Sequence, residues 1–146
     1  MGGKTPTRRD RRERTMRILY VEDNPTDVEL TVLELSKTPC DISVEAVPTK
    51  QEALECLKGH RGKGYDLALL DCRLPDGDGM SILEYIREKR LPLAVVIVTG
   101  SGDEETEAAA FRAGADDFVH KTGNYRSRLS VILEKALERF RGGGLY

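Results

Sequence analysis

Short apolar runs alternate with longer amphipathic segments along most of this chain. The runs that we predict to be strands are 17–23, 43–47, 65–71, 93–99 and 115–120. The residues 67–70 within the third run and nearly all of 93–99 are apolar, as is typical of parallel strands that are covered on both faces. The run 43–47 instead alternates, which indicates a half-exposed strand. The pattern therefore predicts a largely buried sheet of five strands.

Helical periodicity fills the intervals between these runs. The predicted helices cover about 26–36, 49–59, 80–89, 104–112 and a final segment with Leu129, Ile132, Leu133, Ala136, Leu137 and Phe140 on one stripe. Val28, Val32 and Leu35 mark the buried face of the first helix. Thr49 and Glu52 form a capping box for the second helix. Alternating strands and helices predict a single α/β domain, doubly wound around a five-stranded parallel sheet.

Length and composition fit one soluble domain with a real core. The chain has 146 residues, of which 39% are hydrophobic and 33% charged. No apolar run approaches the roughly 20 residues that a membrane span needs, so we expect no membrane contact. The three cysteines, Cys40, Cys56 and Cys72, lack metal-ligand spacing. We interpret them as free thiols and expect a cytoplasmic protein.

The charge is uneven, because residues 1–14 hold six basic side chains against two acidic ones while the whole chain has a net charge of −2. We interpret 1–15 as a disordered basic arm, 16–141 as the folded domain and 142–146 as a flexible Gly-rich tail. A basic arm could also contact nucleic acid or anionic lipid. We expect no nucleic-acid partner, because solvated tails of this kind are common.

Polar side chains stand where the predicted strands end. Right-handed crossovers bring the carboxyl ends of all parallel strands to one edge of the sheet, where open α/β sheets bind their ligands. That edge would hold Glu22, Asp23, Asp71, Thr99 and Lys121. Any one of them alone could be an ordinary turn cap, strand terminus or solvated charge. Together they suggest a common site.

This set of residue types suits phosphoryl chemistry. Clustered carboxylates repel and need a cation, and Mg²⁺ accepts one or two carboxylates while keeping several waters. A carboxylate can also attack phosphorus and form an acyl phosphate. A lysine and a threonine hydroxyl can each contact a phosphoryl oxygen. With a metal present, little more is needed for in-line transfer.

The residues resemble the response-regulator receiver domain over about 16–141. The resemblance rests on the acids ending the first strand, Asp71 before Cys72-Arg73-Leu74-Pro75-Asp76-Gly77-Asp78-Gly79, Thr99 ending the fourth strand and the lysine after the fifth. It implies a flavodoxin-like (βα)5 fold. It also implies the following roles: Asp71 as phosphoacceptor, Glu22 and Asp23 with Asp71 and the Arg73 backbone carbonyl as Mg²⁺ ligands, Lys121 as phosphate contact, and Thr99 with Phe118 as switch residues.

The switch aromatic is expected to turn from an exposed to a buried position when Thr99 moves toward the phosphoryl group. One departure from the family pattern concerns Lys121, which the family usually follows with a proline, often in a cis bond. This chain has Thr122 there. A cis bond before a residue other than proline costs about 2.5–4 kcal/mol, so this bond is either trans or strained.

The resemblance implies a signalling phosphoacceptor that is not an enzyme beyond its own phosphorylation and slow autodephosphorylation. Its partners would be a sensor histidine kinase or phosphotransfer protein and a downstream target or fused effector domain. A homodimer could form through the helix near 104–112, the strand 115–120 and the last helix. The chain could be a stand-alone receiver or part of a longer protein.

Two other function classes compete with this interpretation. The first is an Asp-nucleophile phosphohydrolase, but that mechanism typically needs a second acid two residues after the nucleophile, where this chain has Arg73. The second is a flavodoxin-like module that binds FMN. The loops at the relevant edge lack the aromatic rings that would sandwich a flavin, and the chain contains no Trp.

Overall fold

The computed structural model describes residues 15–60, 64–100 and 104–142. Five strands of this part of the chain form one parallel sheet in the order β2-β1-β3-β6-β7. The strands are β1 (Thr15–Val21), β2 (Asp41–Val47), β3 (Leu67–Asp71), β6 (Ala94–Thr99) and β7 (Asp117–His120). The doubly wound, flavodoxin-like fold predicted from the sequence is confirmed.

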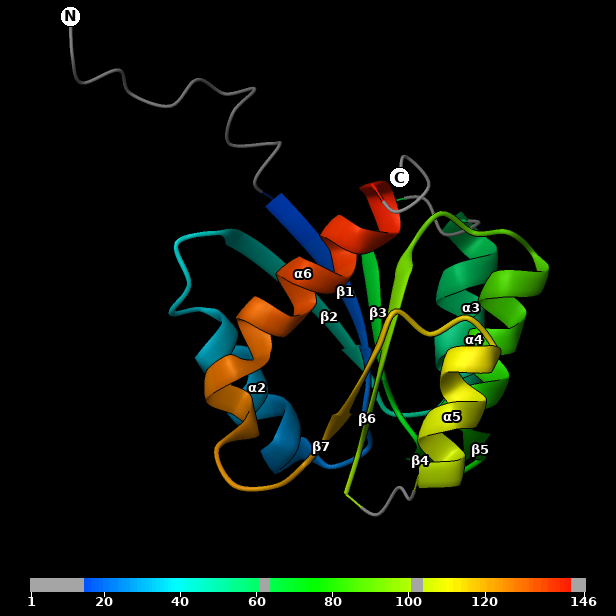
Figure 1. Ribbon diagram of the computed structural model, residues 1–146, viewed down its shortest axis with the longest axis horizontal. Coiled ribbons are helices and arrows are strands. Elements are labelled where there is room, and N and C mark those ends of the chain that lie inside the picture. Colours follow the sequence, from blue (N-terminus) through cyan, green and yellow to red (C-terminus); the bar gives the residue numbers. More distant parts are fainter. Residues whose placement is uncertain (1–14, 61–63, 101–103, 143–146) are drawn as a thin grey trace, which may run out of the picture.

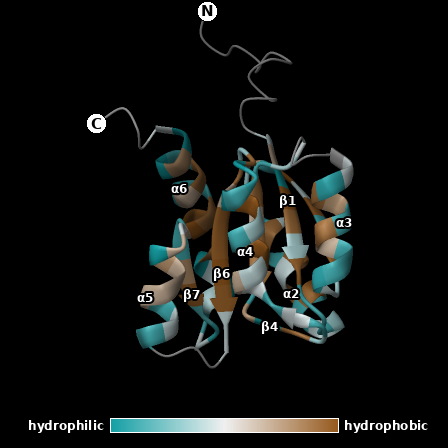
Figure 2. Ribbon diagram, turned by 90° about the vertical axis from the view of Figure 1, so that its right-hand side faces the viewer, coloured by the Kyte–Doolittle hydropathy of each residue, from teal (hydrophilic) through white to brown (hydrophobic). Residues whose placement is uncertain are grey.

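Helices cover both faces of the sheet (Figure 1). One face carries α2 (Pro25–Leu35) and α6 (Leu129–Gly142), and the other carries α3 (Lys50–His60), α4 (Gly79–Glu88) and α5 (Glu104–Arg112). In Figure 2 the latter three helices turn hydrophilic residues outward and brown strands lie behind them. A 3₁₀ turn, η1 (Tyr125–Arg128), precedes α6 and was not predicted.

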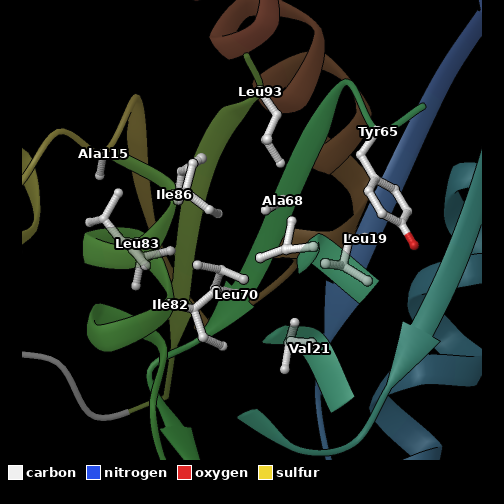
Figure 3. Packing of buried hydrophobic residues seen from close by; sticks show 14 of the residues in the cluster. Leu19, Val21, Tyr65, Ala68, Leu70, Ile82, Leu83, Ile86, Leu93 and Ala115 are labelled. Carbon is white, nitrogen blue, oxygen red and sulfur yellow. The ribbon is translucent and has the colours of Figure 1, made fainter. Parts of the chain in front are cut away.

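The sheet separates two hydrophobic clusters. Leu19, Ala68, Leu70 and their neighbours pack against Ile82, Leu83 and Ile86 of α4, as Figure 3 shows. On the opposite face Ile18, Tyr20, Leu69 and Val96 pack against Leu133, Ala136 and Leu137 of α6. The central strands are therefore buried on both sides, as their continuous apolar sequences predicted.

Several strand boundaries differ from the prediction by about two residues. β1 begins at Thr15 because its ladder with β2 extends to the Thr15–Asp41 pair. This places Thr15 in the sheet rather than in the predicted arm, and Gly142 in α6 rather than in the predicted tail. The rest of the arm and of the tail, 1–14 and 143–146, lies outside the described residues. β3 begins late because the Asp66 carboxylate accepts the N–H of Arg17.

The buried face of α2 is also partly different from the prediction. Val32 is 39% exposed, whereas Thr31 is fully buried. The Thr31 hydroxyl lies 3.3 Å from the hydroxyl of Tyr20, so a polar residue can occupy the inner face with its hydrogen-bonding group satisfied. Helical periodicity that is counted over apolar residues alone does not identify a buried threonine.

The loop after β3 folds into a short antiparallel pair, β4 (Arg73–Leu74) with β5 (Gly77–Asp78). At its tip the Asp76 carboxylate accepts the N–H groups of Lys50 and Gln51, at 2.8 and 2.9 Å, and so caps α3 together with Thr49. These two hydrogen bonds lower the pKa of Asp76. The sequence predicted the Thr49 cap but neither the hairpin nor this second cap.

Glycine at position 79 is required by a close approach of backbone. A Cβ at Gly79 would lie 2.4 Å from the carbonyl oxygen of Asp71, and rigid main chain cannot move aside cheaply. We expect Gly79→Ala to lower the free energy of unfolding by about 1–3 kcal/mol. Gly59→Ala is the matched control, because its Cβ would meet nothing within 4 Å and a helical alanine should stabilise by about 0.5–1 kcal/mol.

Urea unfolding of the two glycine variants would measure the difference. Equal stability of Gly79→Ala and the wild type would contradict the proposed close approach.

The two ends of the described fold lie on the same side of the molecule. Thr15 and Met16 at the start of β1 and Arg141 and Gly142 at the end of α6 line the same pocket of about 550 Å³. This side carries the amino ends of the strands (Figure 1). Among the described residues, no helix is long and apolar enough to cross a membrane.

Candidate functional site

The acidic residues predicted at the carboxyl edge lie together. Glu22 and Asp23 follow β1, and Asp71 ends the neighbouring strand β3. One carboxylate oxygen from each of the three lies within 4.8 Å of the others. Glu22 is 3% exposed and Asp71 8%, whereas Asp23 is open to solvent. The arrangement is a half-open group of hard oxygen donors.

Lys121 points its ammonium group into this acidic cluster. Its Nζ lies 2.7 Å from Glu22 Oε1, 2.9 Å from Asp27 Oδ2 and 3.3 Å from Asp71 Oδ2. The Lys121 N–H donates to the carbonyl of Thr99 at 2.8 Å, which ties the end of β7 to the end of β6. The Lys121–Thr122 bond is trans, since the described residues contain no cis peptide bond. The lysine therefore reaches Asp71 although Thr122 follows it in place of the expected proline.

Asp27 is part of the site although the sequence analysis gave it no such role. It lies in the first turn of α2, close to the start of the helix predicted over about 26–36. Asn24 provides the helix cap instead, accepting the N–H groups of Thr26 and Asp27. The Asp27 carboxylate is thus available to bind Lys121 through one oxygen and Arg126 through the other.

The remaining predicted residues surround Asp71 in an open pocket of about 600 Å³. Its lining includes Glu22, Asp23, Asp27, Asp71, Arg73, Thr99 and Lys121. The backbone N–H of Arg73 donates to Asp71 Oδ1 at 3.1 Å, while the Arg73 residue itself is exposed. Thr99 ends β6 and is 2% exposed. Asp71 itself is 8% exposed and lines the pocket.

Phe118 has a different position from the one expected. Its ring is 8% exposed and packs in the cluster with α4 and α5, with an edge contact to the His120 ring at 5.2 Å. The structure thus has the buried position of the switch aromatic and not the exposed one. A phenylalanine carries no hydroxyl that water or a surface partner could hold, so packing alone favours the buried position.

Burial and mutual contact change the acid–base properties of the cluster. Burial, reinforced by the neighbouring Asp71 carboxylate, raises the pKa of Glu22 from 4.5 to about 7. Hydrogen bonds from Lys121 to Glu22 and Asp27 outweigh the burial of the ammonium group and raise the pKa of Lys121. The lysine therefore stays charged, and Glu22 is the residue of the cluster whose charge changes near neutral pH.

The raised pKa of Glu22 has a consequence for stability. The folded state binds this proton more tightly than the unfolded state, so the contribution is complete below about pH 4.5 and is lost as the pH rises through about 7. We expect Glu22→Gln to reduce the fall in unfolding free energy between pH 5 and pH 8 by about 1–3 kcal/mol. Urea titrations in the presence of a chelator would measure it.

Glu105→Gln, which removes an exposed acid, is the control for this change and should keep the wild-type pH dependence. A pH dependence of Glu22→Gln that matches the wild type would contradict the assignment.

The donor set fits a hard divalent cation. Three carboxylates that converge within 4.8 Å offer oxygen ligands only, which Mg²⁺ prefers, and the exposed side at Asp23 leaves room for water ligands. A softer metal would need imidazole or thiolate donors, and this cluster provides neither.

Known proteins are similar to this chain over most of its length. The family model described as the response regulator receiver domain matches residues 18–133. The regulatory protein LuxO of Vibrio cholerae is 38% identical over 102 residues, which cover 70% of this chain and 22% of LuxO. The transcriptional regulatory protein AruR of Pseudomonas aeruginosa is 32% identical over 114 residues, covering 78% of this chain and 46% of AruR.

Solved structures of receiver domains have the same fold as this chain. The signal receiver domain of a LuxO repressor protein from Vibrio parahaemolyticus superposes with a TM-score of 0.77 at 28% identity, covering 90% of this chain and 96% of that domain. A receiver domain protein from Clostridium thermocellum gives a TM-score of 0.75 at 25% identity. The chain thus spans less than half the length of LuxO and AruR but nearly all of the isolated receiver domains.

Proposed function

Because this chain belongs to the family of response regulator receiver domains, we propose that Asp71 is the residue on which it is phosphorylated. The chain is a phosphoacceptor of two-component signalling by its family. The observation that supports Asp71 as the acceptor is its position: it contacts Lys121, belongs to the acidic cluster and faces the open pocket. The phosphohydrolase and flavin-binding alternatives are not favoured by the comparisons.

The proposed reaction is an in-line transfer from a phosphohistidine. A carboxylate oxygen of Asp71 attacks the phosphorus, the P–O bond forms as the P–N bond to the donor imidazole breaks, and the nitrogen keeps the bonding electrons and is protonated from solvent. The Lys121 ammonium, 3.3 Å from Asp71 Oδ2 before transfer, would donate to a phosphoryl oxygen.

We propose Mg²⁺ as the cofactor, held by Glu22, Asp23 and Asp71 with the backbone carbonyl of Arg73. When bound, the cation would neutralise charge that develops on the phosphoryl oxygens. The carboxylates must be deprotonated to bind the cation. Because the pKa of Glu22 is raised, Glu22 needs a higher pH than an ordinary glutamate to lose its proton.

The proposed partners follow from the family. Receiver domains interact with histidine kinases and effector domains, and the similar proteins include regulators and a sensor kinase. For this chain we propose a sensor histidine kinase or phosphotransfer protein as the donor and a downstream protein or a fused effector domain as the target. We also propose a cytoplasmic location and a homodimer that forms through α5, β7 and α6.

The proposed switch couples Thr99 to the α5–β7–α6 face. A phosphoryl oxygen gives the Thr99 hydroxyl an acceptor, and its movement changes the space next to Phe118. We expect Thr99→Ala to accept label on Asp71 but to lose the amide shift changes over residues 104–122 that a beryllofluoride mimic produces in the wild type. NMR spectra with and without the mimic measure this, and wild-type shift changes in Thr99→Ala would place the coupling elsewhere.

The experiment that tests the proposed function is site mapping of the label. The full chain is incubated with phosphoramidate and Mg²⁺, and the acyl phosphate is trapped and located by mass spectrometry. We expect one label per chain, on Asp71, and none when Mg²⁺ is chelated. A stoichiometric label on another residue would contradict the proposal.

A further inference from the structure

Lys121 contacts three carboxylates, and the proposed reaction changes the bonding of two of them. Lys121 Nζ has three protons and lies near three carboxylates, those of Glu22, Asp27 and Asp71. Two of the three also belong to the acidic group suited to a cation. Asp27 is the exception: it contacts the lysine but is not a member of that group.

This difference matters when the site is occupied. A cation that engages Glu22 competes with the Lys121 ammonium for that carboxylate. Phosphorylation converts the Asp71 carboxylate into an acyl phosphate, whose negative charge lies on the phosphoryl oxygens. Among the described residues in hydrogen-bond contact with that ammonium, only Asp27 then keeps a free carboxylate. The distance of 2.9 Å and the low exposure of the lysine side chain, 15%, give this contact the strength of a partly buried ion pair.

Asp27 is itself held in place from the opposite side. Arg126 Nη2 in η1 lies 2.6 Å from Asp27 Oδ1, and Arg126 Nε lies 3.4 Å from the hydroxyl of the buried Thr31. Thr31 in turn contacts the hydroxyl of Tyr20. The Asp27 carboxylate is thus held between Lys121, which follows β7, and Arg126 of η1, with one oxygen bound to each cation.

We propose that Asp27 is a positioning residue that anchors Lys121 toward the phosphoryl group when Glu22 and Asp71 are engaged. The inference rests on the proposed function, because it concerns the same lysine and the same phosphoacceptor. Asp27 touches neither phosphorus nor the attacking oxygen, and it acts through the lysine. Arg126 supports it by fixing the orientation of the carboxylate.

The test compares label uptake by four full-length variants in phosphoramidate and saturating Mg²⁺. We expect Asp27→Asn to slow uptake on Asp71 about tenfold, because a misplaced catalytic group commonly costs that much or more. Glu29→Gln removes an exposed acid from the same helix and should leave uptake unchanged. In a Lys121→Met background, adding Asp27→Asn should have no further effect. A merely structural role would slow both backgrounds equally.

A second readout covers the case in which Lys121→Met alone takes up no label. With beryllofluoride and Mg²⁺ bound, we expect the ¹⁵N ammonium resonance of Lys121 to be visible in the wild type and to be lost to solvent exchange in Asp27→Asn. Wild-type uptake by Asp27→Asn, equal slowing in both backgrounds, or an unchanged ammonium resonance would overturn the inference. A wild-type chain without label on Asp71 would instead overturn the proposed function.

Discussion

Asp71→Asn is expected to abolish stoichiometric phosphorylation of the full chain. The substitution keeps the shape of the side chain and its place beside Lys121, but an amide oxygen is a far weaker nucleophile than a carboxylate. We expect label uptake from phosphoramidate to fall at least about a hundredfold, the lower range for removing a group that acts on the reacting atoms. Incorporation measured by intact-mass spectrometry over time would give the value.

The matched control for this variant is Asp41→Asn, which removes the same charge from an exposed position on β2 and should leave uptake unchanged. Loss of folding would not explain the expected result. Asp71→Asn relieves repulsion among three carboxylates within 4.8 Å, so its unfolding free energy should match or exceed that of the wild type. A full equivalent of label on Asp71→Asn would refute Asp71 as the acceptor.

Arg87→Met is expected to destabilise the fold by about 3 kcal/mol. The guanidinium of this α4 residue donates to the carbonyls of Gly114 and Leu93, at 3.0 and 2.9 Å, and to the Asp116 carboxylate at 2.8 Å. It also lies 5.2 Å from the centre of the Phe140 ring. Methionine would keep most of the apolar contact and leave a largely buried carboxylate without its cation.

The acid in this network depends on its partner because burial raises the pKa of Asp116. Arg139→Met is the control, since that arginine contacts the Asp116 carbonyl and the Asp117 carboxylate but is 54% exposed, so we expect a change within about 1 kcal/mol. Urea unfolding of both variants tests the difference. Similar stabilities of the two variants would mean that burial does not strengthen the Arg87 contacts.

The sequence predicted the fold class, a parallel sheet with helices on both faces, because its strongest signals coincide with the central strands. The continuous apolar runs at β3 and β6 are typical of parallel strands that are covered by helices on both faces. Strand boundaries differ from the prediction where a side chain, in place of a backbone carbonyl, accepts a hydrogen bond from the neighbouring strand. Asp66 and Asp116 accept N–H groups of Arg17 and Val95, so both strands begin later than their sequence suggests.

The predicted site residues meet because they all follow strands of one sheet, which is a property of topology. Asp27 and Arg126 could not be found by the same reasoning, since they lie 99 positions apart in a helix and in a 3₁₀ turn. Their contact depends on how α2 and α6 pack together. One signal was present: Asp27 follows Asp23 by four residues and lies in the first turn of the helix that begins at the carboxyl edge.

Thr15 and Gly142 line one pocket on the side away from the site, which makes the fold a candidate for circular permutation. Because both ends line one pocket, a short flexible linker could join them without disturbing β1 or α6. Segments attached at either end would likewise leave from the side away from Asp71. A permuted chain would therefore change the order of the elements but keep the site residues together at the carboxyl edge of the sheet.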